Sequence, residues 1–574
     1  MDVFHRRELD RLQKELRDTA GTTILIHDQT CAAEKRRRRK RNEYPDPAKR
    51  AFINEKVCEG CGDCGKKSGC LSVLPVETAL GRKRKIDQSS CNKDYSCVEG
   101  FCPSFVTVEG GKLKKQSPAA ATLEAMPALP APQIPVLHEP FSIMITGVGG
   151  TGVVTIGQVL GMAAYLDHKG VTVLDMAGLA QKGGSVWSHV RIADSQQQLH
   201  AVRIAAGDAN LVLGCDLVVT AAEEALAKMR EGFSHAIVNS YESPTSAFLK
   251  NPDVRFPSRA MKDAVIESVG AGRFWEVNAT RLATALMGDA IASNMFMLGY
   301  AWQRGLVPVS EEALMEAIRL NGAAVKFNQQ AFIWGRHAAH DPARVEALVN
   351  PSSVVQFVPR ETVDGVMHHR AKELVAYQNQ ALAERYKALV EQVVRAEQAV
   401  NPASSALALA VARGYFHVLA YKDEYEVARL YTDGDFLREL ASQFDGDYRL
   451  RFHIGAGWIT GHQPKKVAFG PWLLHGMKLL AKLRFLRGSV LDPFGWQADR
   501  KLERQLIGEF EQQVHSVLDG LNADNLATAV ELIKLFEGVR GFGHVKEAAW
   551  KQAGERQQSL LQRFRQAAGK RKVA

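Results

Sequence analysis

The stretch Cys58-Glu59-Gly60-Cys61-Gly62-Asp63-Cys64 holds three cysteines, each separated from the next by two residues. It decides the interpretation of residues 51–112. Cys70 follows it, and a second run, whose last cysteine precedes a proline, holds Cys91, Cys97 and Cys102. Bacterial two-cluster ferredoxins use a C-x2-C-x2-C run together with a remote cysteine before proline. The spacing therefore predicts a ferredoxin-like double iron–sulfur module.

Two sets of ligands follow from this template. Thiolates are soft ligands that suit iron, and short loops let successive sulfurs surround one cluster. The second run has Asp94 where the template has its middle cysteine. We predict two 4Fe-4S clusters, the second of which can lose one iron and become a 3Fe-4S cluster. The first set is Cys58, Cys61, Cys64 and Cys102; the second is Cys70, Cys91 and Cys97, with Asp94 as an oxygen ligand or an open corner.

Other uses of these cysteines are less consistent with the pattern. Zinc is the main alternative because C-x2-C also occurs in zinc sites, but zinc usually takes two such pairs. Disulfides need an exported chain, and the charged start of this chain lacks the apolar segment of a signal peptide. No apolar stretch is long enough to cross a bilayer. We expect a cytoplasmic location, no membrane contact and a role in electron transfer.

Composition is that of an ordinary multidomain protein. Of its 574 residues, 46% are hydrophobic and 24% charged, and the net charge is +10. Much of that charge lies in the basic run at 34–41. A zinc-stapled nucleic-acid binder would use such a run, but no aromatic stacking platform accompanies it. We expect a solvated or subunit-facing loop, no nucleic-acid partner, and a basic surface that steers an acidic electron carrier.

The fold class expected is multidomain α/β plus α, with five segments. Residues 1–50 hold an amphipathic helix and a short strand at 23–26, too little to form a core of their own. Residues 51–112 form the cluster module, and the Pro- and Ala-rich segment 113–140 is a linker. Residues 141–338 form a Rossmann-like α/β domain. Residues 339–574 are mainly helical, with helical spacing from 363 to 399 and from 501 to 521.

A glycine motif opens the α/β domain. An apolar strand runs into Gly147, Gly149, Gly150 and Gly152, and a second strand ends at Asp175. This spacing is typical of dinucleotide binding, in which backbone N–H groups approach a phosphate and the acid binds a ribose. The alternative is that the glycines serve strand–helix packing and Asp175 caps a loop. Both interpretations stay open on spacing alone.

Several longer peptides carry a family resemblance. The cysteine module is followed by GVGGTGVVT, DMAGLAQKGGSVWSHVRIA and GDANLVLGCDLVV, and AYKDEYEVARLY and VRGFGHVKEAAWKQA lie further on. Together they resemble the 2-oxoacid:ferredoxin oxidoreductases, and most closely the long fused indolepyruvate ferredoxin oxidoreductases of bacteria. The likeness spans essentially the whole chain.

The resemblance implies a function. Residues 141–338 would be the γ-type domain beside a thiamine diphosphate site rather than a nucleotide reader. The reaction would be oxidative decarboxylation of a 2-oxoacid to an acyl-CoA, with coenzyme A as co-substrate and ferredoxin or a similar protein as electron acceptor. Residues in the loop after Asp175 would form a wall of the thiamine and substrate pocket, unless they make an ordinary turn. These candidates are Gln181, Lys182, Gly183, Gly184 and Ser185.

The same resemblance shows what this sequence does not contain. The family's thiamine-binding domain carries a G-D-G motif with a downstream Asn pair for Mg and diphosphate, and Asp445-Gly446-Asp447 lacks both. Residues 1–50 would be a remnant tail of that domain. We expect a thiamine-binding partner chain or a missing N-terminal half, an oligomeric enzyme, and no activity from this chain alone. The alternatives are an iron–sulfur NAD(P)-binding electron-transfer subunit and an inactive fragment of a split gene.

Overall fold

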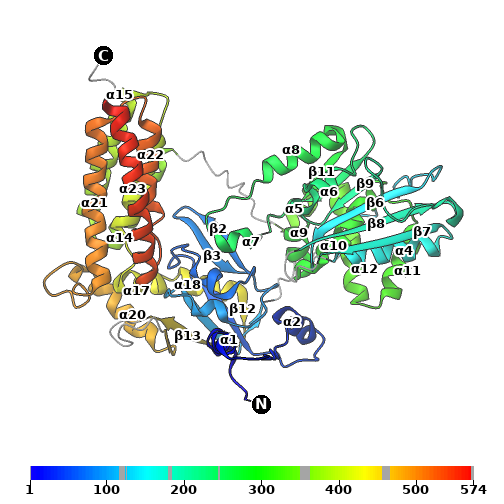
Figure 1. Cartoon of the computed structure of the whole chain (residues 1–574), viewed down its shortest axis with the longest axis horizontal. Helices are drawn as coiled ribbons and strands as arrows, with labels where there is room; N and C mark the ends of the chain where they lie inside the picture. Colours follow the sequence, from blue (N-terminus) through cyan, green and yellow to red (C-terminus); the bar gives the residue numbers. More distant parts are fainter. Residues whose placement is uncertain are drawn as a thin grey trace.

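The chain folds into three lobes. The computed structural model describes residues 2–114, 123, 126–150, 152–178, 184–243, 246–349, 362–455 and 466–569. The cysteine module lies in the centre, with a helical lobe on one side of it and the α/β lobe on the other (Figure 1). None of the helices in the described part of the chain combines the length and hydropathy that a membrane span needs.

The N-terminal segment contains a short 3-10 turn, η1 (Arg6–Glu8), and two helices, α1 (Leu9–Asp18) and α2 (Ala32–Lys40). The predicted amphipathic helix is confirmed as α1, whose leucine face is only half-buried. The strand predicted at 23–26 is wrong: this segment has no regular structure, and Ile24 and Ile26 are exposed. A strand needs a paired neighbour to be stable, and none of the described strands pairs with this segment.

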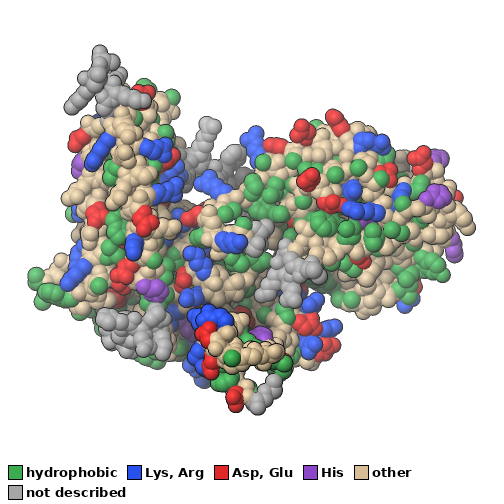
Figure 2. All heavy atoms as spheres, viewed as in Figure 1, with side chains coloured by type: hydrophobic (Ala, Val, Ile, Leu, Met, Phe, Trp, Pro, Cys, Tyr) green, Lys and Arg blue, Asp and Glu red, His purple; other side chains and the backbone are tan. Residues whose placement is uncertain are grey.

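The basic run at 34–41 was expected to be a loop, and that is wrong. It forms α2, which packs on the second cysteine run. Arg36 Nη1 donates to Ser90 O at 2.8 Å, and Arg39 Nη1 donates to Asn92 O at 2.7 Å. On the face drawn in Figure 2, Lys and Arg side chains alternate with Asp and Glu side chains and do not merge into one basic patch.

The cysteine module shares its sheet with the C-terminal region. Strand β4 pairs antiparallel with β1 on one side and with β13 on the other, giving the order β1-β4-β13-β14, and β5 pairs with β12. Aromatic side chains from both regions fill one core, in which Phe52 contacts Phe436 and Phe444 edge-on. The segments 51–112 and 339–574 are therefore joined by packing. The elements involved are β1 (Lys49–Ile53), α3 (Asp63–Ser68), β2 (Val73–Thr78), β3 (Gly81–Ile86), η2 (Ser96–Glu99), β4 (Phe105–Glu109), β5 (Lys112–Leu113), α17 (Glu424–Thr432), α18 (Asp435–Gln443), β12 (Phe444–Asp445), β13 (Arg449–Ile454), β14 (Val467–Phe469), α20 (Leu473–Lys482) and η7 (Leu483–Leu486).

The α/β lobe is built on a six-stranded sheet of order β11-β10-β9-β6-β8-β7. Strands β6, β9, β10 and β11 are parallel, and β8 lies antiparallel between β6 and β7. The strands and the α/β architecture predicted in this lobe are confirmed, and the sheet is mixed because β8 runs antiparallel to both of its neighbours. The strands are β6 (Phe141–Val148), β7 (Gly170–Ala177), β8 (Ser185–Ala193), β9 (Leu211–Gly214), β10 (His235–Asn239) and β11 (Phe274–Val277).

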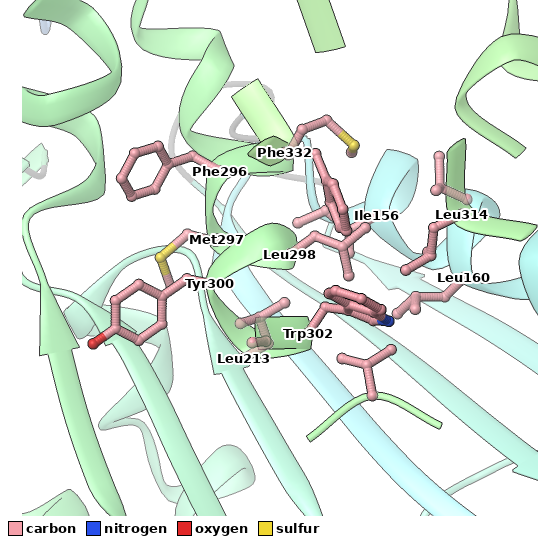
Figure 3. Packing of buried hydrophobic residues seen from close by; sticks show 14 of the residues in the cluster. Ile156, Leu160, Leu213, Phe296, Met297, Leu298, Tyr300, Trp302, Leu314 and Phe332 are labelled. Atoms are coloured by element: carbon pink, nitrogen blue, oxygen red, sulfur yellow. The ribbon is translucent and has the colours of Figure 1, made fainter. Parts of the chain in front are cut away.

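Alternate residues of these strands face two cores. Ile143 and Leu213 pack under helices α4, α10, α11 and α12, whereas Met144 and Val212 face α5, α6 and α8. Figure 3 shows the first core, which contains Leu213 together with Trp302 and Phe332, whose ring centroids are 5.9 Å apart. The helices are α4 (Val153–Leu166), α5 (Leu217–Thr220), α6 (Glu223–Leu226), α7 (Ser246–Lys250), α8 (Ser258–Val269), α9 (Ala279–Met287), α10 (Ser293–Gln303), α11 (Glu311–Asn321), α12 (Val325–His340) and α13 (Pro342–Val349), with 3-10 turns η4 (Gln196–Gln198), η5 (Ala271–Arg273) and η6 (Ala290–Ala292).

The helical lobe is a bundle around its own aromatic core. Tyr415 stacks on Phe510 with ring centroids 5.5 Å apart, and Phe510 meets Phe536 edge-on. The helical spacing predicted for 363–399 and 501–521 is confirmed. The helices are α14 (Val363–Tyr377), α15 (Gln380–Val400), α16 (Ala406–Leu419), α21 (Ala498–Gly520), α22 (Leu526–Glu537) and α23 (His544–Gly569).

Candidate metal centre

The first predicted ligand set is gathered in one place. Cys58 and Cys61 lie in the loop after β1, Cys64 lies in the first turn of α3, and Cys102 lies three residues before β4. Burial raises the pKa of the Cys64 thiol well above its ordinary value, and the charges of Cys102, Cys58 and Cys61 raise it further. The four thiols are therefore close enough to influence one another's pKa.

The second set is gathered separately. Burial raises the pKa of the Cys97 thiol, and the charges of Cys91, Cys70 and Asp94 raise it further. The fold thus divides the seven cysteines between two neighbouring groups. We call them the first group (Cys58, Cys61, Cys64 and Cys102) and the second group (Cys70, Cys91 and Cys97, with Asp94 nearby).

The backbone around both groups is shaped to accept thiolates. Gly60 N donates to Cys58 Sγ at 3.3 Å, and Lys93 N donates to Cys91 Sγ at 3.5 Å. Gly100 approaches the first group closely, since a Cβ on it would lie 2.8 Å from Cys64 Cα. Backbone N–H groups directed at sulfur are one of the means by which proteins stabilise iron–sulfur clusters.

Among the described residues, no three or more His, Cys, Asp or Glu side chains converge in the arrangement that one metal ion requires. Zinc draws its four ligands onto one centre, whereas a cubane distributes its thiolates over four irons. Iron and acid-labile sulfide content therefore distinguishes the two kinds of site.

Asp94 lies at the outer edge of the second group. Its side chain is exposed, and its carboxylate accepts from Ser96 N at 3.3 Å and from Ser96 Oγ at 3.0 Å. These contacts form a local side-chain turn just before η2 (Ser96–Glu99). The residue is close enough to Cys91 and Cys97 to raise the pKa of both thiols.

Sequence reasoning missed a layer of buried charge beside the first group. The ammonium of Lys422 pairs with Glu59 at 2.8 Å and donates to Cys58 O at 3.2 Å. Although burial acts in the opposite direction, Lys422, His417 and Lys83 hold the pKa of the Glu59 carboxyl well below its usual range. Burial lowers the pKa of Lys83 itself to about 7. Lys422 is 364 residues from Cys58 in the chain, so no local signal could have predicted this contact.

The glycine loop of the α/β lobe is occupied by protein contacts. Gly149 N donates to Gly184 O at 2.7 Å, which leaves that N–H unavailable to a phosphate. Gly152 has a φ of +84°, and a Cβ there would lie 1.8 Å from Asn294 Nδ2 on α10. Gly147 pairs with Val186 of β8, and Gly150, at φ +96°, faces open space.

Asp175 lies on the outermost strand, β7, and is exposed. In a dinucleotide fold the ribose-binding acid ends the strand next to the glycine strand. Here the antiparallel β8 separates β7 from β6, and Asp175 pairs in register with Ser188. The geometry therefore favours the packing interpretation of the glycines over nucleotide binding.

The structure describes only part of the predicted pocket wall. Gln181, Lys182 and Gly183 lie outside the described residues. Gly184 binds Gly149 as above, and Ser185 begins β8 opposite Val148. Both lie near the carboxyl end of β6, where α/β sheets bind ligands.

Comparisons with known proteins find family matches for two parts of the chain. Residues 142–338 match the family "Pyruvate ferredoxin/flavodoxin oxidoreductase", and residues 363–559 match a family of unknown function (DUF6537). The chain is 31% identical over 201 residues to the indolepyruvate oxidoreductase subunit IorB of Methanothermobacter thermautotrophicus, a match that covers 35% of this chain and 97% of that protein. The IorB subunit of Pyrococcus horikoshii is 29% identical over 204 residues, covering 35% and 96%.

Among solved structures, the chain is similar to the gamma subunit of a keto/oxoacid ferredoxin oxidoreductase from Geobacter sulfurreducens PCA, with 23% identity and a TM-score of 0.25, covering 35% of this chain and 98% of that one. The family expected from the sequence is confirmed by the match to IorB, which residues of this chain cover almost completely. The chain belongs to the 2-oxoacid:ferredoxin oxidoreductases.

Proposed function

We propose that this chain carries the iron–sulfur relay and the γ-type domain of a thiamine-dependent indolepyruvate-type ferredoxin oxidoreductase. Such an enzyme converts a 2-oxoacid and coenzyme A into an acyl-CoA and carbon dioxide, and passes two electrons to ferredoxin. The observation that carries the proposal is the folding of two separate cysteine groups into one module, attached to a domain of this family. The names of the relatives favour an arylpyruvate such as indolepyruvate as substrate.

Two 4Fe-4S clusters, when bound, would supply single-electron transfer, which hydride carriers do not provide. The chain's own residues have defined parts in this. The cysteines of the two groups hold the irons, the N–H groups of Gly60 and Lys93 stabilise negative charge on sulfur, and burial of Cys58 and Cys64 excludes water.

The two groups differ in what surrounds them, and this suggests a direction. The first group is contacted by the α/β lobe, since a Cβ on Gly62 would lie 2.7 Å from Pro252 Cβ. Beside the second group lies a cavity of about 600 Å³, whose lining includes Arg6, Arg7 and Lys67. Basic side chains attract an acidic carrier by long-range electrostatics. In our proposal electrons enter at the first group and leave to ferredoxin from the second.

The diphosphate and its Mg belong to another chain or segment in this proposal, because the described residues offer no counterpart of the family's binding motif. The enzyme is then an oligomer or a larger protein, and works in the cytoplasm, where thiols stay reduced. The half-exposed leucine face of α1 is consistent with a further protein surface beside it.

The test is the iron and acid-labile sulfide content of the anaerobically purified chain, with electron paramagnetic resonance before and after dithionite. We expect seven or eight irons, at about four for each full cluster, and matching sulfide. Zinc without sulfide would overturn the proposal. Reduced samples should also show signals from two interacting clusters rather than one.

A further inference from the structure

The C-terminal region encloses the first cysteine group, although its sequence family has no known function. Tyr431 of α17 donates its hydroxyl to Pro103 O at 2.6 Å, next to Cys102. Gly541 lies against the loop, since a Cβ on it would lie 3.5 Å from Cys61 Cβ. The rings of Phe101 and His544 are 4.8 Å apart. The wall around the first group is thus built from residues more than 300 positions away in the chain.

The same region brings in two ammonium groups. Lys422 lies between α16 and α17 and donates to Cys58 O, with Glu59 as its ion-pair partner. Lys466, just before β14, donates to Cys102 O at 3.0 Å and sits 4.8 Å from the centroid of the Phe105 ring. No acidic side chain in the described ranges lies within ion-pair distance of Lys466, although the carboxylate of Asp63 is near enough to interact with its charge.

Lys466 occupies a position between the two cysteine groups. Its ammonium interacts electrostatically with Cys102 and Cys64 of the first group and with Cys97 of the second. It also lines the cavity beside Asp94 and Tyr95. Lys422 is more local, and interacts with Cys58 of the first group.

Reduction adds one negative charge to a cluster. A fixed positive charge nearby stabilises the reduced form and raises the reduction potential, most strongly where the surroundings are of low polarity. A lysine between two clusters affects both, and one held beside a single group affects that group. The effect of Lys422 is partly cancelled by its ion-pair partner Glu59, whereas Lys466 interacts only with Asp63, which lies beyond ion-pair distance.

We propose that the C-terminal region is a working part of the electron-transfer module, and that Lys466 sets the reduction potentials of both clusters while Lys422 acts on the first alone. The inference rests on the proposed two-cluster relay. It gives residues 363–559 a role other than binding of substrate or thiamine. They cover the first group and supply positive charge that favours reduction of its cluster.

The test is a redox titration of the full chain followed by electron paramagnetic resonance. We expect Lys466→Met to move both midpoint potentials to lower values and Lys422→Met to move one. Glu59→Gln should shift the potential of the first cluster upward, opposite to Lys422→Met. Lys466→Arg should keep the wild-type values, because it retains the charge. The matched control is Lys478→Met, which removes an exposed lysine of α20 in the same region.

Several outcomes would overturn the inference. Unchanged potentials in Lys466→Met with full iron content would do so, as would an equal shift in Lys478→Met. If Lys466→Met does not retain iron, two further variants separate charge from packing. Iron retained in Lys466→Arg but not in Lys466→Gln would support a requirement for the positive charge. Loss of iron in Lys466→Arg as well would indicate that Lys466 acts through packing alone. Absence of iron and sulfide in the wild-type chain would instead contradict the proposed function itself.

Discussion

The two cysteine groups lie in one small module, yet they are held by different parts of the chain. The first group is covered by Lys422 and Gly541 from the C-terminal region and by Pro252 from the α/β lobe. The second is held by the N-terminal helix α2, whose Arg36 and Arg39 bind the backbone on either side of Cys91. Asp94, at its edge, is exposed.

In the proposed function, this difference would give the two groups different roles in electron transfer. The motif itself supplies thiols at suitable spacing, and these are much alike in the two groups. What differs is the protein packed around them. One group is contacted by two other lobes, and the other lies beside a cavity lined by both basic and acidic side chains, among them Lys67, Asp94 and Glu99. Solvent exposure and nearby charge are among the factors that set cluster potentials.

Removal of one thiol from each group should give the largest effect. We expect Cys64→Ala to lose the first cluster, about four irons, and to destabilise the core beneath it, because Cys64 is buried. Cys97→Ala should lose the second cluster and leave the first in place. Iron, sulfide and spin quantitation measure both. Cys31→Ala, which alters an exposed cysteine outside both groups, is the control. Loss of all iron from either variant would mean that the groups do not bind independently.

Asp94→Cys should have a smaller effect, confined to the second group. A fourth thiolate should hold the fourth iron, so an oxidised three-iron signal present in the wild type should disappear. Asp94→Asn is the companion variant, since the side-chain oxygen of Asn can accept the same bond from Ser96 N. It should retain the fold while weakening any carboxylate–iron bond. Two fully occupied cubanes in the wild-type chain would contradict an open corner at Asp94.

The sequence could predict those features that depend on local spacing. Patterns that lie within about 25 residues of each other, or a single template, predict the two cysteine groups, the glycine turn after β6 and the long helices α15 and α21. The partition of Cys102 into the first group came from the ferredoxin template, and the fold places it there.

Features that depend on distant pairing could not be predicted. Strand β13 completes the module's sheet because Phe452 pairs with Val106, and neither short strand signals the other in sequence. Lys83 lies in the highly charged stretch Gly81–Ile86, which indicates a solvated strand, yet its side chain is buried beside Glu59. The reversed strand β8 was missed because alternation of apolar residues shows a strand but not its direction.

The seam between the module and the C-terminal region should itself depend on pH. Burial, with Glu55 nearby, raises the pKa of Glu439 from 4.5 to about 7. A carboxyl whose pKa is higher in the folded state stabilises the fold when protonated. This contribution is fully present below about pH 4.5 and is lost as the pH rises through about 7. The shift alone corresponds to about 3 kcal/mol, which we reduce to about 1 kcal/mol because the side chain is partly exposed.

Glu439→Gln, which stays neutral, should therefore be more stable than the wild type at pH 8 by about 1 kcal/mol, with little difference at pH 4.5. Denaturant unfolding at the two pH values measures this, and Glu391→Gln on the exposed face of α15 is the control. An equal difference at both pH values would show that packing, not charge, is responsible.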